Sequence, residues 1–492
     1  QNILAETNSY ELVISDKKDL SGLPNELIET AAADAKSKGK AGKWVFTLSN
    51  SSVMPFLQYS SNRKLRQEIW NAYQMRANNG NDKDNKSLAI KIANLRGEKA
   101  RLLGYATHAD YVLEKSMAKN PETANKLLND LWIPALNMAN KEAADIQKMM
   151  QKEGINEPVQ PYDWRYYTEH IRKERFDLDE QEMKPYFSLE KTREGVFTVC
   201  KNLYGLQFKQ LNNVPKYHED VTVWEVTEAN GSHVGILYMD FHPRTSKRGG
   251  AWMTSYRTQK MENGKRVAPV VSIVCNFTKP TENAPALLTF DEVSTFFHEF
   301  GHALHGLLSN VTYESLAGTS VPRDFVELPS QIMENWAAEP EVMKMYAKHY
   351  KTGEIIPDAL IEKMQKAGTF DQGFVTTEYL AASILDMAYH TQKTAITTDA
   401  ETFEKEAMTK INLPSTIIPR YRSTYFNHIF AGGYSAGYYS YIWSGVLDTD
   451  AFEVFKINGL FNSDYAKSFR KNVLQKGGTE DPMELYKSFR SA

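Results

Sequence analysis

Apolar residues recur at every third or fourth position through most of the first two hundred residues. Three segments show this spacing most clearly, with Lys and Glu between the apolar positions: 61–78, 85–104 and 120–151. This period is typical of amphipathic helices that bury one face. The third segment contains Pro134, which we expect to kink the helix or to mark a boundary.

The pattern changes near residue 206. Four short runs rich in β-branched and aromatic residues follow, with Gly, Pro, Asn and Lys between them: VTVWEVT (221–227), HVGILYMDFH (233–242), GAWMTSY (250–256) and APVVSIVCNF (268–277). Such runs predict the short strands of a small sheet. After residue 289 the helical period returns. We therefore predict a mainly α-helical protein with one small β-sheet, divided into a helical lobe (1–205) and a second lobe (206–492) that carries the sheet.

Length and charge narrow the class of protein. A chain of 492 residues is too long for one simple core, which favours two or three packed lobes. The net charge of −3 provides neither a basic field for nucleic acid nor a polybasic patch for a membrane. We find no apolar run of 18 residues, so we expect no membrane-spanning helix.

The cysteines and the start of the chain give little further information about the class of protein. Two cysteines, Cys200 and Cys275, provide neither a disulfide framework nor a cysteine-based zinc site, and a single bridge between them is the alternative to two free thiols. The chain begins with Gln1 and shows no signal-peptide pattern, so we expect a processed product or a fragment. The compartment is either the cytoplasm or the periplasm, and the sequence does not decide between them.

The segment TFFHEFGHALH (295–305) is the strongest chemical signal. Thr289 and Glu292 form a capping-box pattern ahead of it, which predicts the start of a helix. His298 and His302 stand one turn apart, so their rings can converge on one point. Two neutral imidazoles at this spacing suit a zinc ion, while Glu299 can reach a nearby water and take its proton. His305 follows on the same stripe, and we interpret it as a structural or orienting residue rather than a ligand.

A catalytic zinc ion requires a third protein ligand and an open position. The segment DFVELPSQIMENWAAE (324–339) is predicted to be a helix that packs against the first, with Asp324 as its N-cap. Residue chemistry alone leaves five candidate ligands: Glu314, Asp324, Glu327, Glu334 and Glu339.

A tyrosine-rich segment, RYRSTYFNHIFAGGYSAGYYSYIW (420–443), is the second chemical signal. Tyr434, Tyr438 and Tyr441 have the spacing of one helical face, and the Gly432–Gly433 pair ahead of them permits a bend. Phenol groups donate well to a developing oxyanion. The alternative is an aromatic stripe in the core.

The two signals together resemble one known family. HEFGHALH, followed 25 residues after His302 by a glutamate in GTSVPRDFVELPSQ, is similar to the thimet oligopeptidase, neurolysin and peptidyl-dipeptidase family of zinc metallopeptidases. The resemblance implies one zinc ion held by His298, His302 and Glu327. Asp324 and Gln331 are then hypothetical partners that orient the ligands through hydrogen bonds.

The tyrosine-rich segment is similar to another block of the same family. Its histidine corresponds to His428, and the tyrosines that stabilise the transition state correspond to Tyr434 and Tyr441, with Tyr438 as a third that contacts substrate. The mobile glycine-rich loop of the family corresponds to Gly432–Gly433.

The resemblance also implies the architecture and the partners. It predicts a two-lobed helical gluzincin fold around a channel that admits short peptides. Family members carry a helical portion ahead of residue 1 of this chain, so a companion N-terminal fragment is expected. We expect neither nucleic-acid nor membrane partners, and the oligomeric state is not predicted.

Two activities compete within the family. PRYRSTYF (419–426) and AGYY (436–439) are more similar to the bacterial peptidyl-dipeptidase, which removes dipeptides from a free C-terminus. Arg420 and Arg422 could bind that terminal carboxylate, or they form a solvated pair. The alternative is an endo-acting oligopeptidase. A third hypothesis, from a different functional class, is a catalytically inactive zinc-containing protein that binds peptides.

The segment 268–277 is either an edge strand that could pair with an extended peptide or an internal strand.

Overall fold

The computed structural model describes residues 1–281 and 284–491. The chain divides into two compact units: unit 1 is Gln1–Asp179 with Glu362–Tyr439, and unit 2 is Glu180–Ile361 with Ser440–Ala492. This division differs from the expected one at residue 205, because 180–205 belong to unit 2 and 362–439 return to unit 1. The mainly α-helical class with a small sheet is confirmed.

Unit 1 is helical apart from one pair of three-residue strands. Its strands are β1 (Leu12–Ile14) and β2 (Trp44–Phe46), which pair antiparallel. Its helices are α1 (Asn2–Ser9), α2 (Asn25–Ser37), α3 (Asn50–Tyr59), α4 (Arg63–Gln74), α5 (Lys86–Leu102), α6 (His108–Leu113), α7 (Pro121–Lys152), α8 (Pro161–Phe176), α16 (Gln372–His390), α17 (Ala400–Lys410) and α18 (Asn427–Phe430). The three helices predicted from apolar spacing are thus confirmed as α4, α5 and α7.

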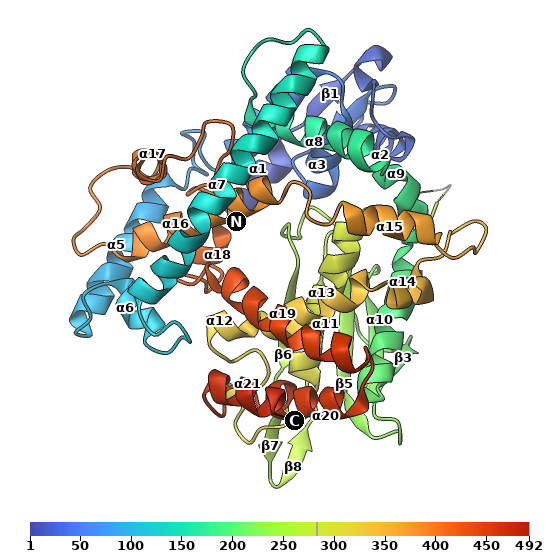
Figure 1. Ribbon diagram of the computed structural model, residues 1–492, viewed down its shortest axis with the longest axis vertical. Helices are drawn as coiled ribbons and strands as arrows, with labels where there is room; N and C mark the ends of the chain where they lie inside the picture. Colours follow the sequence, from blue (N-terminus) through green and yellow to red (C-terminus); the bar gives the residue numbers. More distant parts are fainter. Residues whose placement is uncertain (282–283, 492) are drawn as a thin grey trace. The chain divides into compact units, whose positions relative to one another are not determined.

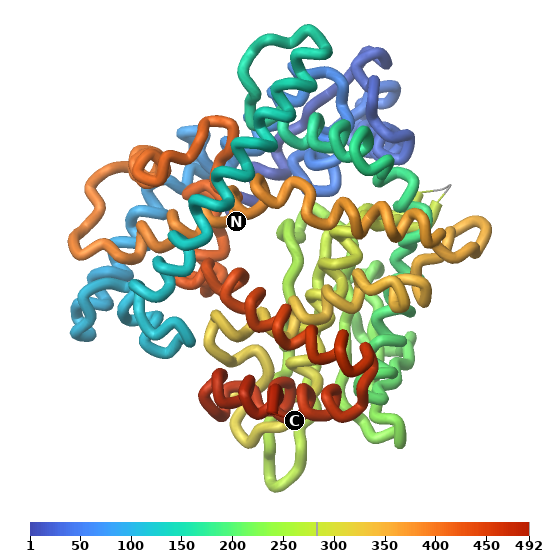
Figure 2. The backbone as a smooth tube through the Cα atoms, in the orientation of Figure 1, coloured from blue at the N-terminus to red at the C-terminus, as the bar shows by residue number. Residues whose placement is uncertain are grey.

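Helices α7 and α16, with 32 and 19 residues, are the two longest helices of unit 1. They lie side by side although they are far apart in the sequence (Figure 2). Gly373 permits this approach, because a Cβ atom there would stand 2.6 Å from the carbonyl carbon of Met138. Helix α7 continues through Pro134, so this proline does not mark a boundary. Phe374 at the start of α16 stacks on Trp164 at 4.6 Å between ring centroids.

Unit 2 contains the five-stranded sheet and the helices that surround it (Figure 1). The strands are β3 (Gln207–Leu211), β4 (Thr222–Thr227), β5 (His233–Asp240), β6 (Trp252–Arg257) and β9 (Val270–Val274), with a separate hairpin of β7 (Lys260–Glu262) and β8 (Lys265–Val267). The helices are α9 (Glu180–Met183), α10 (Leu189–Tyr204), α11 (Phe290–Leu307), α12 (Arg323–Val326), α13 (Leu328–Ala338), α14 (Pro340–Tyr346), α19 (Ser440–Asn458), α20 (Ser463–Phe469) and α21 (Pro482–Arg490). The boundary between the two units in the sequence falls within helix α15 (Asp358–Lys366).

The sheet order is β3-β4-β5-β9-β6. All four predicted strands are present, and β3 is an addition. Strand β9 pairs parallel with β5 and antiparallel with β6, so the segment 268–277 forms an internal strand, and its reading as an edge strand is wrong. The strands at the edges are β3 and β6.

Helix α11 packs its apolar face against this sheet. The predicted capping box is present: the Thr289 side chain accepts from the Glu292 N–H, and the Glu292 side chain accepts from the Thr289 N–H. Gly306 permits close packing, because a Cβ atom there would lie 3.1 Å from Cγ1 of Val271. The predicted apolar positions are buried, and so is His305, which the spacing alone placed on the polar side.

The segment 324–339 forms two helices rather than one. Helix α12 ends at Val326 and α13 begins at Leu328, with Glu327 at the junction. Pro329 accounts for the break, because proline has no N–H to continue the hydrogen-bond ladder of α12. The predicted N-cap is also wrong: Pro322 precedes α12, and Asp324 lies within it.

Cys200 and Cys275 are free and buried, which agrees with the absence of a disulfide framework. Among the described residues, no helix combines the length and the apolar content that crossing a bilayer requires.

Candidate active site

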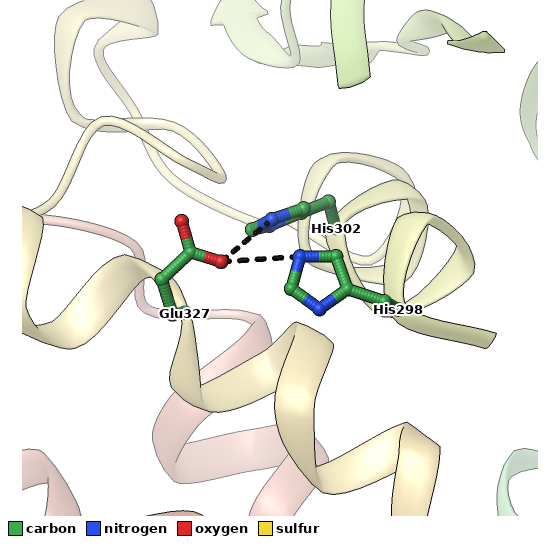
Figure 3. A group of neighbouring side chains, drawn as sticks. All are labelled: His298, His302 and Glu327. Carbon is green, nitrogen blue, oxygen red and sulfur yellow. Dashed lines mark ion pairs between the residues drawn. The ribbon is translucent and has the colours of Figure 1, made fainter. Parts of the chain in front are cut away.

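His298, His302 and Glu327 meet at one point in unit 2 (Figure 3). The two histidines lie on α11, one turn apart, and Glu327 lies at the junction of α12 and α13. Oε2 of Glu327 is 3.2 Å from Nε2 of His298 and 3.1 Å from Nε2 of His302. One ligand atom from each residue lies within 4.8 Å of the others, so the three can hold a metal ion.

The donor set and its spacing fit a zinc ion. Tetrahedral zinc binds imidazole nitrogen and carboxylate oxygen at about 2.0–2.2 Å, which places neighbouring ligand atoms about 3.3 Å apart. The carboxylate oxygen lies close to this distance from both imidazole nitrogens. His298 and His302 are both partly exposed.

The close approach of α11 and α13 brings the three residues together. Gly301 lies between the two histidines in sequence, and its backbone contacts the first turn of α13. A Cβ atom at this position would stand 2.6 Å from Cα of Ser330 and closer still to the carbonyl oxygen of Pro329. Only glycine therefore lets Glu327 reach the histidines.

Two further side chains orient the ligands. Glu334 Oε1 lies 2.6 Å from Nδ1 of His298, which directs Nε2 toward Glu327. Ser294 donates to the other oxygen of Glu334 at 3.0 Å. Ser330 donates to Oε2 of Glu327 at 3.0 Å and to its backbone carbonyl at 2.8 Å.

The sequence did not identify Glu334 or Ser330 in these roles. A signal was present for Glu334, because it lies seven residues after Glu327 and so projects from a similar face of the helix. Of the two residues proposed as orienting partners, Gln331 donates to the backbone carbonyl of Tyr441 at 3.0 Å, and the backbone carbonyl of Asp324 accepts from Ser444 at 2.9 Å. The orienting role of these two side chains stays a prediction.

Charge and burial act against each other at these ligands. Burial lowers the pKa of His298, but the carboxylates of Glu327 and Glu334 outweigh burial and raise this pKa well above its usual value. Burial likewise raises the pKa of Glu327, yet the two imidazoles outweigh it and hold the pKa of this carboxyl well below its usual value. The surroundings of Glu327 therefore favour a negatively charged carboxylate beside a positive centre.

Glu299 lies beside the ligands on α11 but makes different contacts. It is 4% exposed, and its Oε2 atom has no hydrogen-bond partner within 1–281 and 284–491. Burial raises the pKa of Glu299, while the two neighbouring histidines partly offset this rise. A buried carboxylate with a free lone pair and a raised pKa has the properties of a general base.

His305 is fully buried three residues after His302. Burial lowers its pKa to about 3, so the ring is neutral at physiological pH. It is not among the three residues that meet at the metal position.

The tyrosine-rich segment is not one helix. Residues 431–439 contain turns and bends but no helix. Of Tyr434, Tyr438 and Tyr441, only Tyr441 lies in a helix, α19. Gly433 and Ala436 adopt left-handed backbone conformations (φ +84° and +54°), which interrupt a helix. The predicted common helical face of Tyr434, Tyr438 and Tyr441 is therefore wrong.

The three tyrosines have different surroundings. Tyr438 is 3% exposed, and its ring packs at 4.9 Å from that of Phe426, as in the alternative of an aromatic core residue. Tyr434 is half-buried, with its ring centroid 6.0 Å from that of His428 on α18. These residues belong to unit 1, whereas Tyr441 and the metal ligands belong to unit 2.

The two arginines also differ. Nε of Arg422 donates to the buried carboxylate of Glu404 at 2.7 Å, so this guanidinium has a structural partner. Arg420 is about half-exposed, and its NH1 atom lies 3.9 Å from Oε1 of Glu378. Gly432 and Gly433 are exposed at the tip of the turn that follows α18.

An HExxH helix, a glutamate from a second helix and an adjacent buried glutamate define a metallohydrolase site. The family model described as Peptidase family M3 matches residues 56–492, and the chain belongs to this family. It is a metallopeptidase, as the names of its relatives also indicate.

Two relatives and one solved structure illustrate the match. The chain is 40% identical over 493 residues to the dipeptidyl carboxypeptidase of Escherichia coli (strain K12), covering 100% of this chain and 72% of that protein. It is 37% identical over 501 residues to oligopeptidase A of the same organism, covering 99% and 73%. A structure titled PZ peptidase A with inhibitor 2 shares the fold, with a TM-score of 0.50 and 16% identity over 94% of this chain and 71% of that chain.

Proposed function

We propose that this chain is a zinc-dependent peptidyl-dipeptidase, which removes dipeptides from the free C-terminus of short peptides. The convergence of His298, His302 and Glu327 beside the buried Glu299 is the observation that carries the proposal. The relative at 40% identity, named a dipeptidyl carboxypeptidase, supports the specificity.

His298, His302 and Glu327 would hold the zinc ion, and Glu334 would keep the ring of His298 in its binding orientation. When bound, zinc would supply Lewis-acid polarisation of the scissile carbonyl and of a water molecule. Glu327 remains ionised there, because its pKa is held low by the two imidazoles.

Glu299 is the proton carrier. It takes a proton from the water whose oxygen attacks the scissile carbonyl carbon. The same carboxyl group then gives this proton to the leaving amine nitrogen as the C–N bond breaks. Its burial and raised pKa favour holding the proton between the two steps.

Phenol and imidazole groups stabilise the oxyanion in this proposal. Tyr441 donates to the developing negative charge, since its backbone is fixed to the metal-binding element through Gln331. His428 and Tyr434 help to stabilise the transition state, as the resemblance to the family implies.

Strand β6 is the edge strand beside α11, and we expect an extended peptide to pair with it.

Arg420 is the candidate receptor for the terminal carboxylate of the substrate. Its side chain is 47% exposed, against 22% for Arg422, and this greater exposure supports the role for Arg420. Cleavage of a peptide series with free and amidated C-termini tests the specificity. We expect amidation to abolish dipeptide release; equal cleavage of the amide at an internal bond would instead identify an endo-acting oligopeptidase.

The catalytic part of the proposal has a separate test. Glu299→Gln should bind zinc normally, since Glu299 is not a ligand, but should lose activity by about 10²–10⁴-fold. Metal analysis and a chelator-sensitive cleavage assay measure the two properties. Near-normal turnover in this variant contradicts the role of Glu299, and a parent protein that binds zinc and peptide without cleavage would be a binding protein.

A further inference from the structure

A buried polar cluster in unit 1 binds the backbone of the turn 431–439. Asp386 and His390 lie one helical turn apart on α16, and each is 1% exposed. Oδ1 of Asp386 accepts from Nδ1 of His390 at 2.8 Å and from the backbone N–H of Ala436 at 2.9 Å. Oδ2 accepts from the backbone N–H of Tyr438 at 2.9 Å. One carboxylate thus holds two N–H groups of the turn.

Arg96 of α5 holds the chain on the other side of this turn. Its NH1 atom donates to the carbonyl of Ile429 at 2.7 Å, and its NH2 atom donates to the carbonyl of Phe430 at 3.3 Å. NH1 also lies 3.1 Å from Nε2 of His390. Because arginine only donates, Nε2 of His390 accepts and Nδ1 carries the proton that Asp386 receives. His390 therefore connects the two anchors.

His108 adds a third point of attachment, with Nε2 at 3.0 Å from Oγ of Ser435. The cluster thus contacts residues 429 and 430 before the glycine pair and residues 435, 436 and 438 after it. The segment 431–433 between these anchors is exposed. The cluster therefore holds the backbone on both sides of Gly432–Gly433.

One of the anchored residues has a backbone conformation that needs such restraint. Ala436 is fully buried with φ +54°, a left-handed conformation that costs free energy for a residue with a Cβ atom. Its N–H is one of the two that Asp386 holds. The carboxylate therefore stabilises the conformation that directs the neighbouring side chains.

We propose that Asp386 is a positioning residue for peptide hydrolysis, acting through the turn that carries Tyr434 and follows His428. The inference rests on the proposed function of these two residues. With both sides of the glycine pair fixed, the phenol and imidazole groups keep one direction, which lowers the cost of ordering them during the reaction. Asp386 itself needs no contact with substrate.

Asp386→Asn tests this role with almost no change in size. The amide keeps one acceptor, but its NH2 group cannot accept from the N–H of Ala436 or Tyr438. We expect kcat to fall on the order of 10–100-fold, as for a small misplacement of catalytic groups, with KM changed much less. Hydrogen exchange of the amides in 431–438 should become faster, and zinc content should stay unchanged.

Asp371→Asn is the matched control, because Asp371 lies at the start of the same helix and accepts from Trp164 rather than from the turn. It should leave kcat and the exchange of 431–438 unchanged. If Asp386→Asn does not fold, Arg96→Lys is the second variant that tests the anchoring of the turn. One ammonium group cannot replace both guanidinium contacts to Ile429 and Phe430. That variant should change the same two measurements in the same direction.

Unchanged kcat and unchanged exchange in a folded variant would overturn the proposal. A fall in activity matched by an equal loss of folded protein would also overturn it, because the cluster would then be structural only. The exchange measurement does not depend on activity, so it tests the anchors even if the assigned roles of His428 and Tyr434 fail. Faster exchange with normal kcat would show that the turn is anchored but not used in the reaction.

Discussion

Single residues in this site differ mainly in what surrounds them. Glu299, Glu327 and Glu334 are three glutamates of one site with different neighbours. Within the described part of the chain, one oxygen of Glu299 has no hydrogen-bond partner, whereas Glu327 contacts two imidazoles and Glu334 contacts Nδ1 of His298. In the proposal, these different neighbours distinguish a proton carrier from a ligand and from an orienting group. The same residue type therefore takes three roles in the proposal.

Glu334 provides a test of ligand orientation. Glu334→Gln should lower zinc affinity about 10–100-fold, because the ring of His298 loses its charged partner at Nδ1. Competition with a chromogenic chelator measures this affinity. Glu341→Gln, on the exposed surface of α14, is the control and should leave zinc binding unchanged. Equal affinity in both variants would show that Glu334 does not orient the ligand.

Tyr441 provides a test of oxyanion stabilisation. Tyr441→Phe should lower kcat more than it raises KM, because the phenol group acts only when negative charge develops. Steady-state kinetics with one short peptide separates the two constants. A rise in KM with normal kcat would instead make Tyr441 a residue that only binds substrate.

At the scale of elements, apolar spacing predicted the helices well where one face is buried. Helices α4, α5, α7 and α11 follow it, because a continuous buried face leaves a regular period. Helical spacing predicted continuous helices that are absent where backbone geometry interrupts them, at Pro329 and at Ala436. It also could not identify the internal position of β9, since strand order depends on distant pairing.

The site was predictable to the extent that it is local. His298, His302 and Glu299 share one helix, so spacing alone assigned their roles. Glu327 followed only from the resemblance, because residue chemistry left five carboxylates open. Asp386 gave no signal, since its two contacts with the turn lie about fifty residues away in the sequence and involve only the backbone of Ala436 and Tyr438.

The contact between α11 and α13 can be tested at Gly301. Alanine is the better helix former by about 1 kcal/mol, but the added methyl group meets backbone atoms of Pro329 and Ser330 that cannot yield. We expect Gly301→Ala to destabilise the protein by about 1–3 kcal/mol and to weaken zinc binding. Denaturant unfolding and metal competition measure the two effects.

Gly97→Ala on α5 is the control for this substitution. Its Cβ atom would meet only the flexible end of Arg101, at 3.2 Å from NH1. We therefore expect it to be neutral or to stabilise the protein by up to about 1 kcal/mol. If both alanine variants behave alike, helix contact at Gly301 does not control the site.

At the scale of the whole molecule, stability depends on pH through buried acids. Burial raises the pKa of Asp371 to about 7. Between its usual value near 3.8 and about 7, the folded chain holds a proton that the unfolded chain has lost, so stability falls as pH rises through this window. Asp371→Asn keeps an acceptor for Trp164 and removes this loss.

We expect the asparagine variant to be more stable than the parent by at least about 1 kcal/mol at pH 8, with the difference shrinking toward pH 4. Thermal unfolding across this range measures it. A difference that does not vary with pH would show that Asp371 is ionised in the folded protein.

The division into units makes α7 dependent on a distant part of the chain. Its partner α16 begins only after the 219 residues of 153–371. On a ribosome that adds about 5–20 residues per second, the face of α7 that α16 covers stays open for roughly 10–45 seconds after α7 emerges. The nascent chain therefore presents an apolar surface for chaperones to bind during this time, and slower translation would prolong that exposure.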